Sequence, residues 1–359
     1  MRSEALQRLL ADTGFADAVR DPLPGDASTR RYERLILPDR RAMLMDAPRS
    51  NESAPCPPGA TPAERRLLGW NASSRLAASR VDAFVAVAQH LRGLGLAAPE
   101  IYGAEIEAGY AVIEDLGDSL YANVIPQGAD ENTLYAEAAR VLAAVHKAPM
   151  PQRLDAPGGS WPLLDFDALA LEVNADLFVE WLPQAADVRI DDAQRARWEK
   201  IRDGLIVKAL GFPRALTIRD YHAENLLWLP DRQGLQRVGL LDFQDAVRGW
   251  RAWDFAMLLH DARRDVSPAA ADTAIRAYLD ETGAGDADFR RELCVLGAIN
   301  AMRILGIFAR LAARDGKQRY LSFMPREWGH LSRTLAHPAL ADARAFVEEV
   351  AAPYLERAA

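Results

Sequence analysis

Cysteines, long apolar runs and basic runs are all scarce in this sequence. Only two cysteines occur in 359 residues, Cys56 in a proline-rich segment and Cys294 in a long apolar helix; free thiols are expected, and no metal cluster is visible. No stretch approaches the roughly eighteen consecutive apolar residues of a membrane span. The N-terminus also lacks the unbroken apolar region of a signal peptide, so we expect a cytoplasmic protein without membrane attachment.

The charge balance excludes a further class of partner. The 43 basic and 51 acidic residues leave a formal net charge of −8, and no basic run is long enough to follow a phosphate backbone, so nucleic acid is not expected to bind. The composition is 50% hydrophobic, 26% charged and 8% aromatic, which is typical of a well-buried folded protein. Because 359 residues exceed one ordinary core, two lobes with a cleft are predicted.

The first part of the chain has the pattern of a small sheet. Short apolar segments at 30–37 and 41–47 are separated by the turn "PDR", and two more strands joined by a glycine turn are predicted within 100–118. One helix, at 80–96, interrupts them. Residues 48–66 carry five prolines and are predicted to form a surface loop.

From residue 132 onward the periodicity is mostly helical. Helices are predicted at 133–148, at 165–182 with Asp165 as N-cap, and at 191–210. In "SPAAADTAIRAYLDETG" Ser267 caps the helix, Pro268 takes its first position and Gly283 ends it. Short strands are predicted at 215–220, 225–229 and 238–243. The fold class is therefore α+β, with a small sheet lobe that contains a helix and a larger, mostly helical lobe.

Polar side chains gather where these short strands end. In "RDYHAENLLWL" Asp220 stands five residues before Asn225, and Asp242 follows seventeen residues later in "LLDFQDA". The spacing of the first pair alone is weak evidence, since it occurs about once by chance in a chain of this length. Together, however, one carboxylate for an acceptor hydroxyl and two hard oxygen ligands for Mg²⁺ are what phosphoryl transfer requires. Asp220 fits the catalytic role, and Asn225 and Asp242 fit the metal.

These motifs resemble those of the aminoglycoside phosphotransferase-like kinases. "IRDYHAENLL" is similar to the catalytic loop of that family and "LLDFQDA" to its metal-binding strand, while "DAVRGWRAWDFAMLLHDAR" resembles the glycine turn and helix that follow, the helix beginning near Trp253 and Asp254. The resemblance implies a protein-kinase-like fold with ATP and Mg²⁺ as cofactors. It makes 1–116 the nucleotide-binding lobe and 117–359 the catalytic and substrate-binding lobe.

The resemblance also suggests where the nucleotide binds. "PGDASTRRY" is similar to the turn that covers the ATP phosphates, and "AVIEDLGDSLY" to the hinge, where the backbone of Glu114 and Leu116 would meet the adenine edge. Plain loops are the alternative for both segments. The residues assigned to the phosphate turn are Gly25, Asp26, Ala27 and Ser28.

One feature of the kinase pattern is missing. Residues 1–146 contain no lysine and the helix at 80–95 contains no glutamate, so the usual ion pair that holds the α- and β-phosphates is absent. Arg30 and Arg31 are the best substitutes, because a guanidinium binds phosphate oxygens bidentately. They could equally be solvated charges on an edge strand, which discourage aggregation.

Within the family, the order of the motifs most resembles the kinases that phosphorylate the anomeric hydroxyl of N-acetylmuramate or N-acetylglucosamine in cell-wall recycling. An acidic sugar would favour an arginine, and Arg303 and Arg310 lie seven residues apart on one helix face, although solvent-facing charges are the alternative. His222 is a third substrate candidate or a loop-stabilising residue. A kinase of an aminoglycoside, choline or homoserine, or a nucleotide-binding pseudokinase, stays open at this point. No obligate protein partner is evident.

Overall fold

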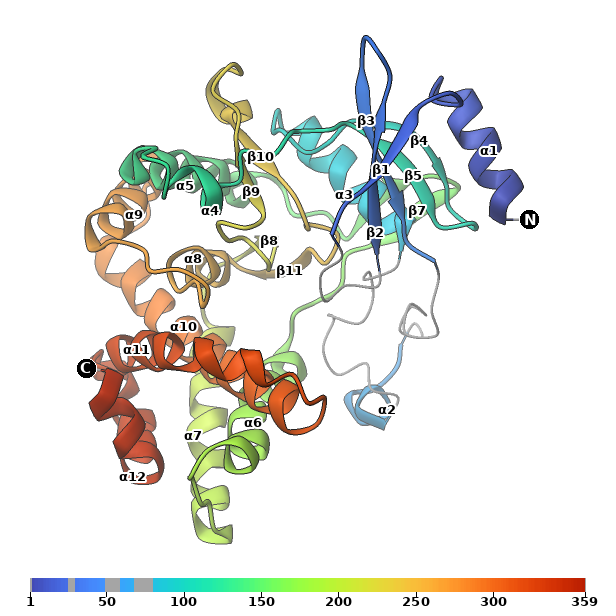
Figure 1. Ribbon diagram of the computed structural model, residues 1–359. Helices are drawn as coiled ribbons and strands as arrows, with labels where there is room; N and C mark the ends of the chain where they lie inside the picture. Colours follow the sequence, from blue (N-terminus) through green and yellow to red (C-terminus); the bar gives the residue numbers. More distant parts are fainter. Residues whose placement is uncertain (1, 25–29, 49–58, 68–79, 359) are drawn as a thin grey trace.

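The computed structural model describes residues 2–24, 30–48, 59–67 and 80–358, and the first part of the chain is built on one antiparallel sheet (Figure 1). The strands of this sheet are β1 (Val19–Pro22), β2 (Arg31–Ile36), β3 (Arg41–Asp46), β4 (Ile101–Glu105) and β5 (Tyr110–Ile113). They lie in the order β1-β2-β3-β5-β4, and all neighbours are antiparallel. The strands predicted at 30–37, at 41–47 and within 100–118 are confirmed; β1 is an additional edge strand.

Alternate residues of this sheet face two separate apolar layers. On β3, Leu44 packs in a cluster with Leu9 of helix α1 (Arg2–Asp12), whereas the next residue, Met45, belongs to the main core together with Phe84 of α3 (Val81–Gly93). Successive side chains of a strand point to opposite faces, so one strand closes both layers. Figure 1 shows α1 on the outer side of the sheet, away from the helices of the C-terminal part.

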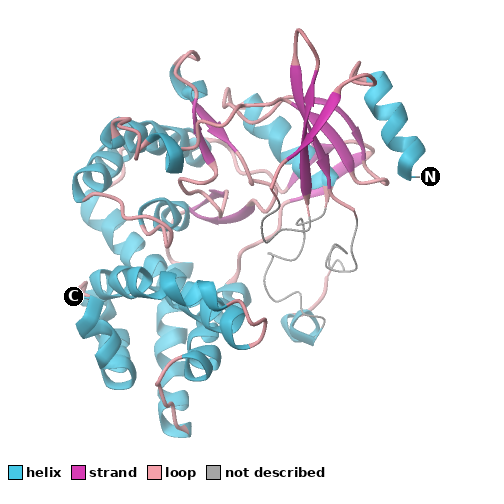
Figure 2. Cartoon of the chain, in the orientation of Figure 1, coloured by secondary structure: helices cyan, strands magenta, loops and turns pink. Residues whose placement is uncertain are grey.

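The rest of the chain is mostly helical (Figure 2). Its helices are α4 (Tyr121–Val124), α5 (Glu131–Lys147), α6 (Ala168–Ala185), α7 (Asp192–Leu210), α8 (Arg251–Leu259), α9 (Pro268–Thr282), α10 (Asp286–Ala313), α11 (Met324–Leu335) and α12 (Ala341–Ala358). Short 3₁₀ turns are η3 (Gly234–Arg237), η4 (Gln318–Phe323) and η5 (Pro338–Leu340). Three two-stranded sheets pair β6 (Arg153–Ala156) with β7 (Gly159–Pro162), β8 (Arg214–Thr217) with β11 (Val247–Trp250), and β9 (Leu226–Trp228) with β10 (Val238–Leu240).

Helix α10 is the central helix of this part and packs against α6, α8 and α11. Its approach to α6 depends on Gly306, because a Cβ there would lie 2.4 Å from the backbone of Leu177. Within the described residues α10 is also the one helix long and apolar enough to cross a membrane, but 78% of its apolar window is buried inside the protein. It therefore serves here as a core helix.

The predicted helix ends are partly right. Ser267 accepts a hydrogen bond from the N–H of Ala270, Pro268 opens α9, and Gly283 adopts a left-handed φ of 68°, so this capping prediction is confirmed. The N-cap predicted at Asp165 is wrong, because Asp167 accepts from the N–H of Ala170 instead. Asp165 instead forms ion pairs with two arginines of the β8–β11 pair, Arg214 and Arg248.

Two further expectations are corrected. The glycine turn predicted before α8 is strand β11, in which Gly249 lies so close to Thr217 of β8 that a Cβ would be 2.6 Å from its Oγ1. The predicted surface loop at 48–66 ends in a helix, α2 (Pro62–Leu67), which begins at the last of its prolines, and residues 49–58 lie outside the described part of the chain. Proline at the first helical position is favourable because its missing N–H has no partner there in any case.

The boundary predicted at residue 116 falls between β5 and α4. One buried core crosses it, from Val87 and Ile113 on the sheet side to Leu142 and Phe255 on the helical side. The sheet and the helices therefore share apolar packing, and the division into two functional lobes stays a prediction.

Candidate active site

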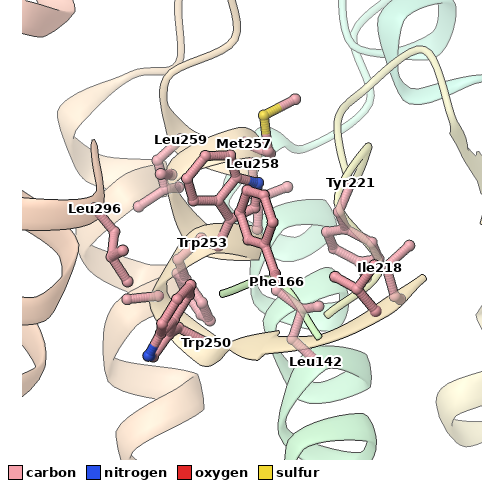
Figure 3. Close-up of a cluster of buried hydrophobic side chains, with 14 of the residues drawn as sticks. Leu142, Phe166, Ile218, Tyr221, Trp250, Trp253, Met257, Leu258, Leu259 and Leu296 are labelled. Atoms are coloured by element: carbon pink, nitrogen blue, oxygen red, sulfur yellow. The ribbon is translucent and has the colours of Figure 1, made fainter. Parts of the chain in front are cut away.

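The segment that carries Asp220 lies between β8 and β9 and is anchored in the core on both sides. Ile218 and Tyr221 are buried, and Figure 3 shows them pointing into a cluster with Phe166 and Leu142. The hydroxyl of Tyr221 donates to the carbonyl oxygen of Ala138 at 2.9 Å. Apolar anchors on either side hold the polar residue between them at a defined place.

The backbone of this loop is held by a buried carboxylate on α8. Asp254, with no exposed surface, accepts from the N–H groups of Ile218 and Arg219, both at 2.8 Å. Arg219 has a φ of 80°, a conformation that costs energy in a non-glycine residue and persists only when its surroundings impose it. Asp254 therefore holds the backbone of the loop that carries Asp220. The sequence placed Asp254 near the start of a helix but indicated no role for it. The local feature that could have pointed to such a role is an aspartate within the apolar run "WDFAMLL".

Asn225 is oriented by the same loop. Its Nδ2 donates to the backbone carbonyl of Asp220 at 2.8 Å and lies 3.3 Å from Nε2 of His222. The amide oxygen is left without a hydrogen bond to any residue that the structure describes. An amide oxygen with no protein partner suits a hard cation such as Mg²⁺.

Asp242 follows β10 directly and has a φ of 53°. Its Oδ1 accepts from Nε2 of Gln244 at 2.9 Å and from the guanidinium of Arg30. Burial on its own would raise the pKa of Asp242, but the charge and hydrogen bond of Arg30 outweigh it, so the pKa lies below its usual value. The anionic form of the carboxylate is thus favoured, and among the described residues no hydrogen bond is found to its Oδ2.

A second carboxyl in the same segment behaves in the opposite way. Burial, opposed by the charge of Arg219 and reinforced by that of Asp220, raises the pKa of Asp245 to about 6. Its Oδ1 is buried and has no hydrogen bond within the described part of the chain. The surroundings therefore shift the pKa values of two aspartates three residues apart in opposite directions, and Asp242 is the one whose anionic form is stabilised.

A cavity of about 340 Å³ opens between the sheet and this loop. Asn225 and Asp242 line it from one side, Arg30 and Leu116 from the other. Arg31, by contrast, is exposed on β2 and is not among the lining residues. Gly25, Asp26, Ala27 and Ser28, assigned to the phosphate turn, lie outside the described residues. Arg30 and Arg31 were both considered as replacements for the missing lysine, and of these two only Arg30 lines the cavity.

The far end of this cavity is the segment after β5. The N–H of Glu114 donates to the carbonyl of Glu100 at 2.8 Å, and its side chain pairs with Arg232, so the side chain is not available to a ligand. The carbonyl oxygen of Glu114 and the N–H of Leu116 have no recorded partner among the described residues. An acceptor and a donor two residues apart match the amino group and ring nitrogen of an adenine edge.

One wall of this cavity was missed by sequence analysis. Arg34 of β2 donates to the carboxylate of Asp115 at 2.8 Å and to that of Asp118 at 2.7 Å, and Arg41 reaches the same Asp115. The Arg34–Asp115 pair is shielded from solvent, with side chains 15% and 1% exposed, whereas Asp118 and Arg41 at its edge are exposed. Arg30 is also bonded to protein groups, Asp242 and Gln244, so both arginines of this cavity are held in place by hydrogen bonds.

Asp220 lines a different cavity, of about 180 Å³, which is bounded by α8, α10 and the segment after α8. His222 and Arg303 line it too, while Arg310 does not. Burial, followed by the charge of Arg219, lowers the pKa of Arg303 to about 10, and its Nη1 donates to Oδ1 of Asn300 at 3.1 Å. The apolar side of this smaller cavity, named the acceptor cavity in the proposals below, is formed by Met257, Ile304, Ile307, Phe308 and Leu311.

The two cavities meet at the loop. Asp220 faces the smaller cavity, Asn225 and Asp242 face the larger one, and the hydrogen bond from Asn225 to the Asp220 carbonyl ties the two sides together. Within the described residues no three or more histidine, cysteine, aspartate or glutamate side chains form a cluster that could hold a metal ion. A cation at Asn225 and Asp242 would therefore also need oxygen atoms of a bound small molecule. Two adjoining cavities that share one loop could hold two small molecules side by side, as group transfer between two substrates requires.

Comparison with known proteins supports this interpretation. Residues 20–293 match the model of the phosphotransferase enzyme family. The chain is 51% identical over 353 residues to the N-acetylmuramate/N-acetylglucosamine kinase of Caulobacter vibrioides, covering 97% of this chain and 96% of that one, and 32% identical to the protein of the same name from Pseudomonas aeruginosa, covering 89% and 85%.

A solved structure of a choline/ethanolamine kinase family protein from Mesorhizobium loti matches with a TM-score of 0.59 at 15% identity, covering 97% of this chain and 100% of that one. At that identity the likeness concerns the fold alone, and it confirms the protein-kinase-like architecture predicted from the motifs. The chain belongs to the phosphotransferase enzyme family and is an ATP-dependent small-molecule kinase.

Proposed function

We propose that this protein transfers the γ-phosphoryl group of ATP to the anomeric hydroxyl of an amino sugar, N-acetylmuramate or N-acetylglucosamine. The product would be the sugar 1-phosphate, formed in the cytoplasm during recycling of peptidoglycan. The relatives named for these two sugars, at up to 51% identity over nearly the whole chain, support the acceptor class. The observation that carries the proposal is the single loop whose Asp220 faces the acceptor cavity while its Asn225 faces the nucleotide cavity.

The nucleotide cavity has groups suited to each part of Mg·ATP. The backbone at Glu114 and Leu116 would bind the adenine edge, and Arg30, together with residues 25–28, would bind the phosphates. Asn225 and Asp242 would hold Mg²⁺, since one amide and one carboxylate oxygen fit a cation that also binds phosphate oxygens. When bound, the ion would neutralise charge on the β- and γ-phosphates.

The carboxylate of Asp220 has no hydrogen-bond partner among the described residues and faces the acceptor cavity. It is therefore available to accept a hydrogen bond from the acceptor hydroxyl and to align it with the phosphoryl group. Because the transition state of phosphoryl transfer is loose, the hydroxyl proton passes to this carboxylate late. The anomeric hydroxyl is the most acidic one of a sugar, which makes this modest assistance sufficient.

The size of the acceptor cavity supports a single-ring acceptor. At about 180 Å³ it is smaller than the roughly 300–1,000 Å³ common for drug-sized ligands. An aminoglycoside of several rings would need more room. The apolar side chains of α10 offer a surface for the methyl group of an acetamido substituent.

The position of phosphorylation is a direct test. With either amino sugar and Mg·ATP, we expect a product whose phosphorus signal disappears in mild acid, because a glycosyl phosphate hydrolyses far more readily than a 6-phosphate ester. Phosphorus NMR before and after acid treatment measures this. An acid-stable product would place the reaction elsewhere on the ring. Turnover on choline or an aminoglycoside but on neither amino sugar would reject the proposed acceptor.

A matched pair of variants tests the phosphate-binding role of Arg30. Arg30→Met should weaken ATP binding by about tenfold to a hundredfold, since a hydrogen bond to a charged group is worth about 1.5–3 kcal/mol. Arg31→Met changes the neighbouring, exposed residue in the same way and should alter the affinity by less than about twofold. Calorimetric titration with ATP distinguishes the two, and a larger loss from Arg31→Met would transfer the role to that residue.

A further inference from the structure

The acceptor cavity contains polar atoms that no described residue satisfies. Two of its lining residues, His222 and Asp261, are buried, at 5% and 2% exposure. Nδ1 of His222 and Oδ2 of Asp261 are both enclosed and have no hydrogen-bond partner within the described part of the chain. Buried polar atoms are costly unless they are paired, so a ligand or water is needed to complete them.

The neighbours of His222 determine what it offers. Its Nε2 lies 3.3 Å from Nδ2 of Asn225 and 3.5 Å from Nη1 of Arg263, and both of these groups are donors. Nε2 is therefore the acceptor of the ring, which leaves the proton on Nδ1. The unpaired Nδ1–H is thus a hydrogen-bond donor.

Asp261 offers the complementary group. Its Oδ1 accepts from the N–H of Arg263 at 2.9 Å, which fixes the carboxyl in place and leaves Oδ2 as an acceptor. One donor and one acceptor, beside the carboxylate of Asp220, match the alternating character of sugar hydroxyl and amide groups. Acidic and neutral amino sugars both carry these groups, so this pair cannot distinguish them.

Arg263 differs from the other arginines considered for the acceptor. Its side chain is 44% exposed, and its Nε pairs with Oε2 of Glu224 at 2.7 Å, itself 48% exposed. An exposed ion pair contributes little stability, so Glu224 can be exchanged for a ligand carboxylate at small cost. Arg303, in contrast, is enclosed beside Asn300 and is already close to Asp220 and Glu327, and Arg310 does not line the cavity.

We propose that Arg263, at the mouth of the acceptor cavity, recognises an anionic substituent on the acceptor sugar, while Asp261 and His222 bind the ring that acidic and neutral acceptors share. This inference rests on the proposed amino-sugar kinase function. It replaces Arg303 and Arg310 as the carboxylate-binding candidates, and it makes Arg263 a specificity-determining residue.

The test pairs a change in the protein with a change in the ligand. Wild-type protein should have a KM for N-acetylmuramate at least tenfold below that for its methyl ester, which lacks the charge. In Arg263→Gln this difference should fall below about threefold. Arg290→Gln is the matched control: this arginine is 43% exposed, pairs with the exposed Asp286 and does not line the cavity, so its variant should keep the wild-type difference. Thermal unfolding checks that each variant folds.

A second variant tests the shared part of the site. Asp261→Asn keeps an oxygen for the Arg263 N–H and converts the other acceptor into a donor. It should raise KM for N-acetylmuramate and N-acetylglucosamine alike by at least tenfold, with ATP affinity unchanged, which a merely structural role would not produce.

The outcomes separate the two levels of the proposal. No turnover of either sugar by the wild type rejects the proposed function. Turnover by the wild type with equal KM for the acid and its ester, or a difference that survives in Arg263→Gln, overturns the role of Arg263 and leaves the kinase function standing. An Asp261→Asn variant with both KM values unchanged removes Asp261 from the ring-binding site.

Discussion

Asp220→Asn should reduce kcat by about 10²- to 10⁴-fold, the usual contribution of a general base or positioning group, while leaving ATP affinity nearly unchanged. The side chain faces the acceptor cavity rather than the nucleotide cavity, and its carboxyl oxygens have no partner among the described residues. The amide keeps the size of the side chain but cannot accept the hydroxyl proton. Single-turnover kinetics together with calorimetric ATP titration measure the two effects separately.

Asp280 provides the matched control. It is exposed on α9 and lines neither cavity, so Asp280→Asn makes the same chemical change and should leave kcat unaltered. A tenfold change in rate corresponds to about 1.4 kcal/mol in the barrier. If Asp220→Asn retains more than about a tenth of the wild-type kcat, Asp220 is not the catalytic carboxylate.

Asp242→Ala should change the affinity for ATP, and the direction of this change should depend on whether Mg²⁺ is present. Removing the carboxylate takes away a proposed ligand of Mg²⁺, so the affinity for Mg·ATP should fall by about tenfold or more. It also removes one carboxylate that pairs with Arg30, whose side chain is only 10% exposed. With this negative charge removed, Arg30 would bind phosphate more readily, so ATP without Mg²⁺ should bind as well as to the wild type, or better.

Calorimetric titration with ATP, once with Mg²⁺ and once with a chelator, measures this reversal. Asp242→Asn, which keeps an oxygen but loses the charge, should lie between the wild type and the alanine variant. An alanine variant with wild-type affinity for Mg·ATP would place the metal site elsewhere, and equal losses with and without Mg²⁺ would indicate a structural role only.

Much of the architecture follows from local patterns in the sequence. Alternation of apolar and polar residues predicted β2 and β3, and a serine, a proline and a glycine at the right positions marked both ends of α9. Such signals act through neighbours in sequence, where backbone preference and side-chain period are decided. The order of the motifs also identified the family correctly.

Local patterns misled where a distant partner competed. Asp165 stands where an N-cap would be expected, but the two arginines of the β8–β11 pair attract it, and Asp167 caps α6 instead. The family resemblance implied a turn at Gly249, yet this residue lies in strand β11, where it packs closely against Thr217. In both cases tertiary contacts outweighed the local preference.

For the site, the sequence determined the identity and spacing of the groups, and the tertiary structure decided their relations. Asp220, Asn225 and Asp242 were identifiable because strand ends in a short segment place polar side chains at one edge. The pairing of Arg30 with Asp242, 212 residues apart, could not be read from any local pattern. The hydrogen bonds from the loop backbone to Asp254 could not be predicted from local patterns either. The same holds for the position of Arg263 at the acceptor cavity. These contacts depend on how the helices pack against the sheet, and that packing is set by the whole buried core rather than by neighbouring residues.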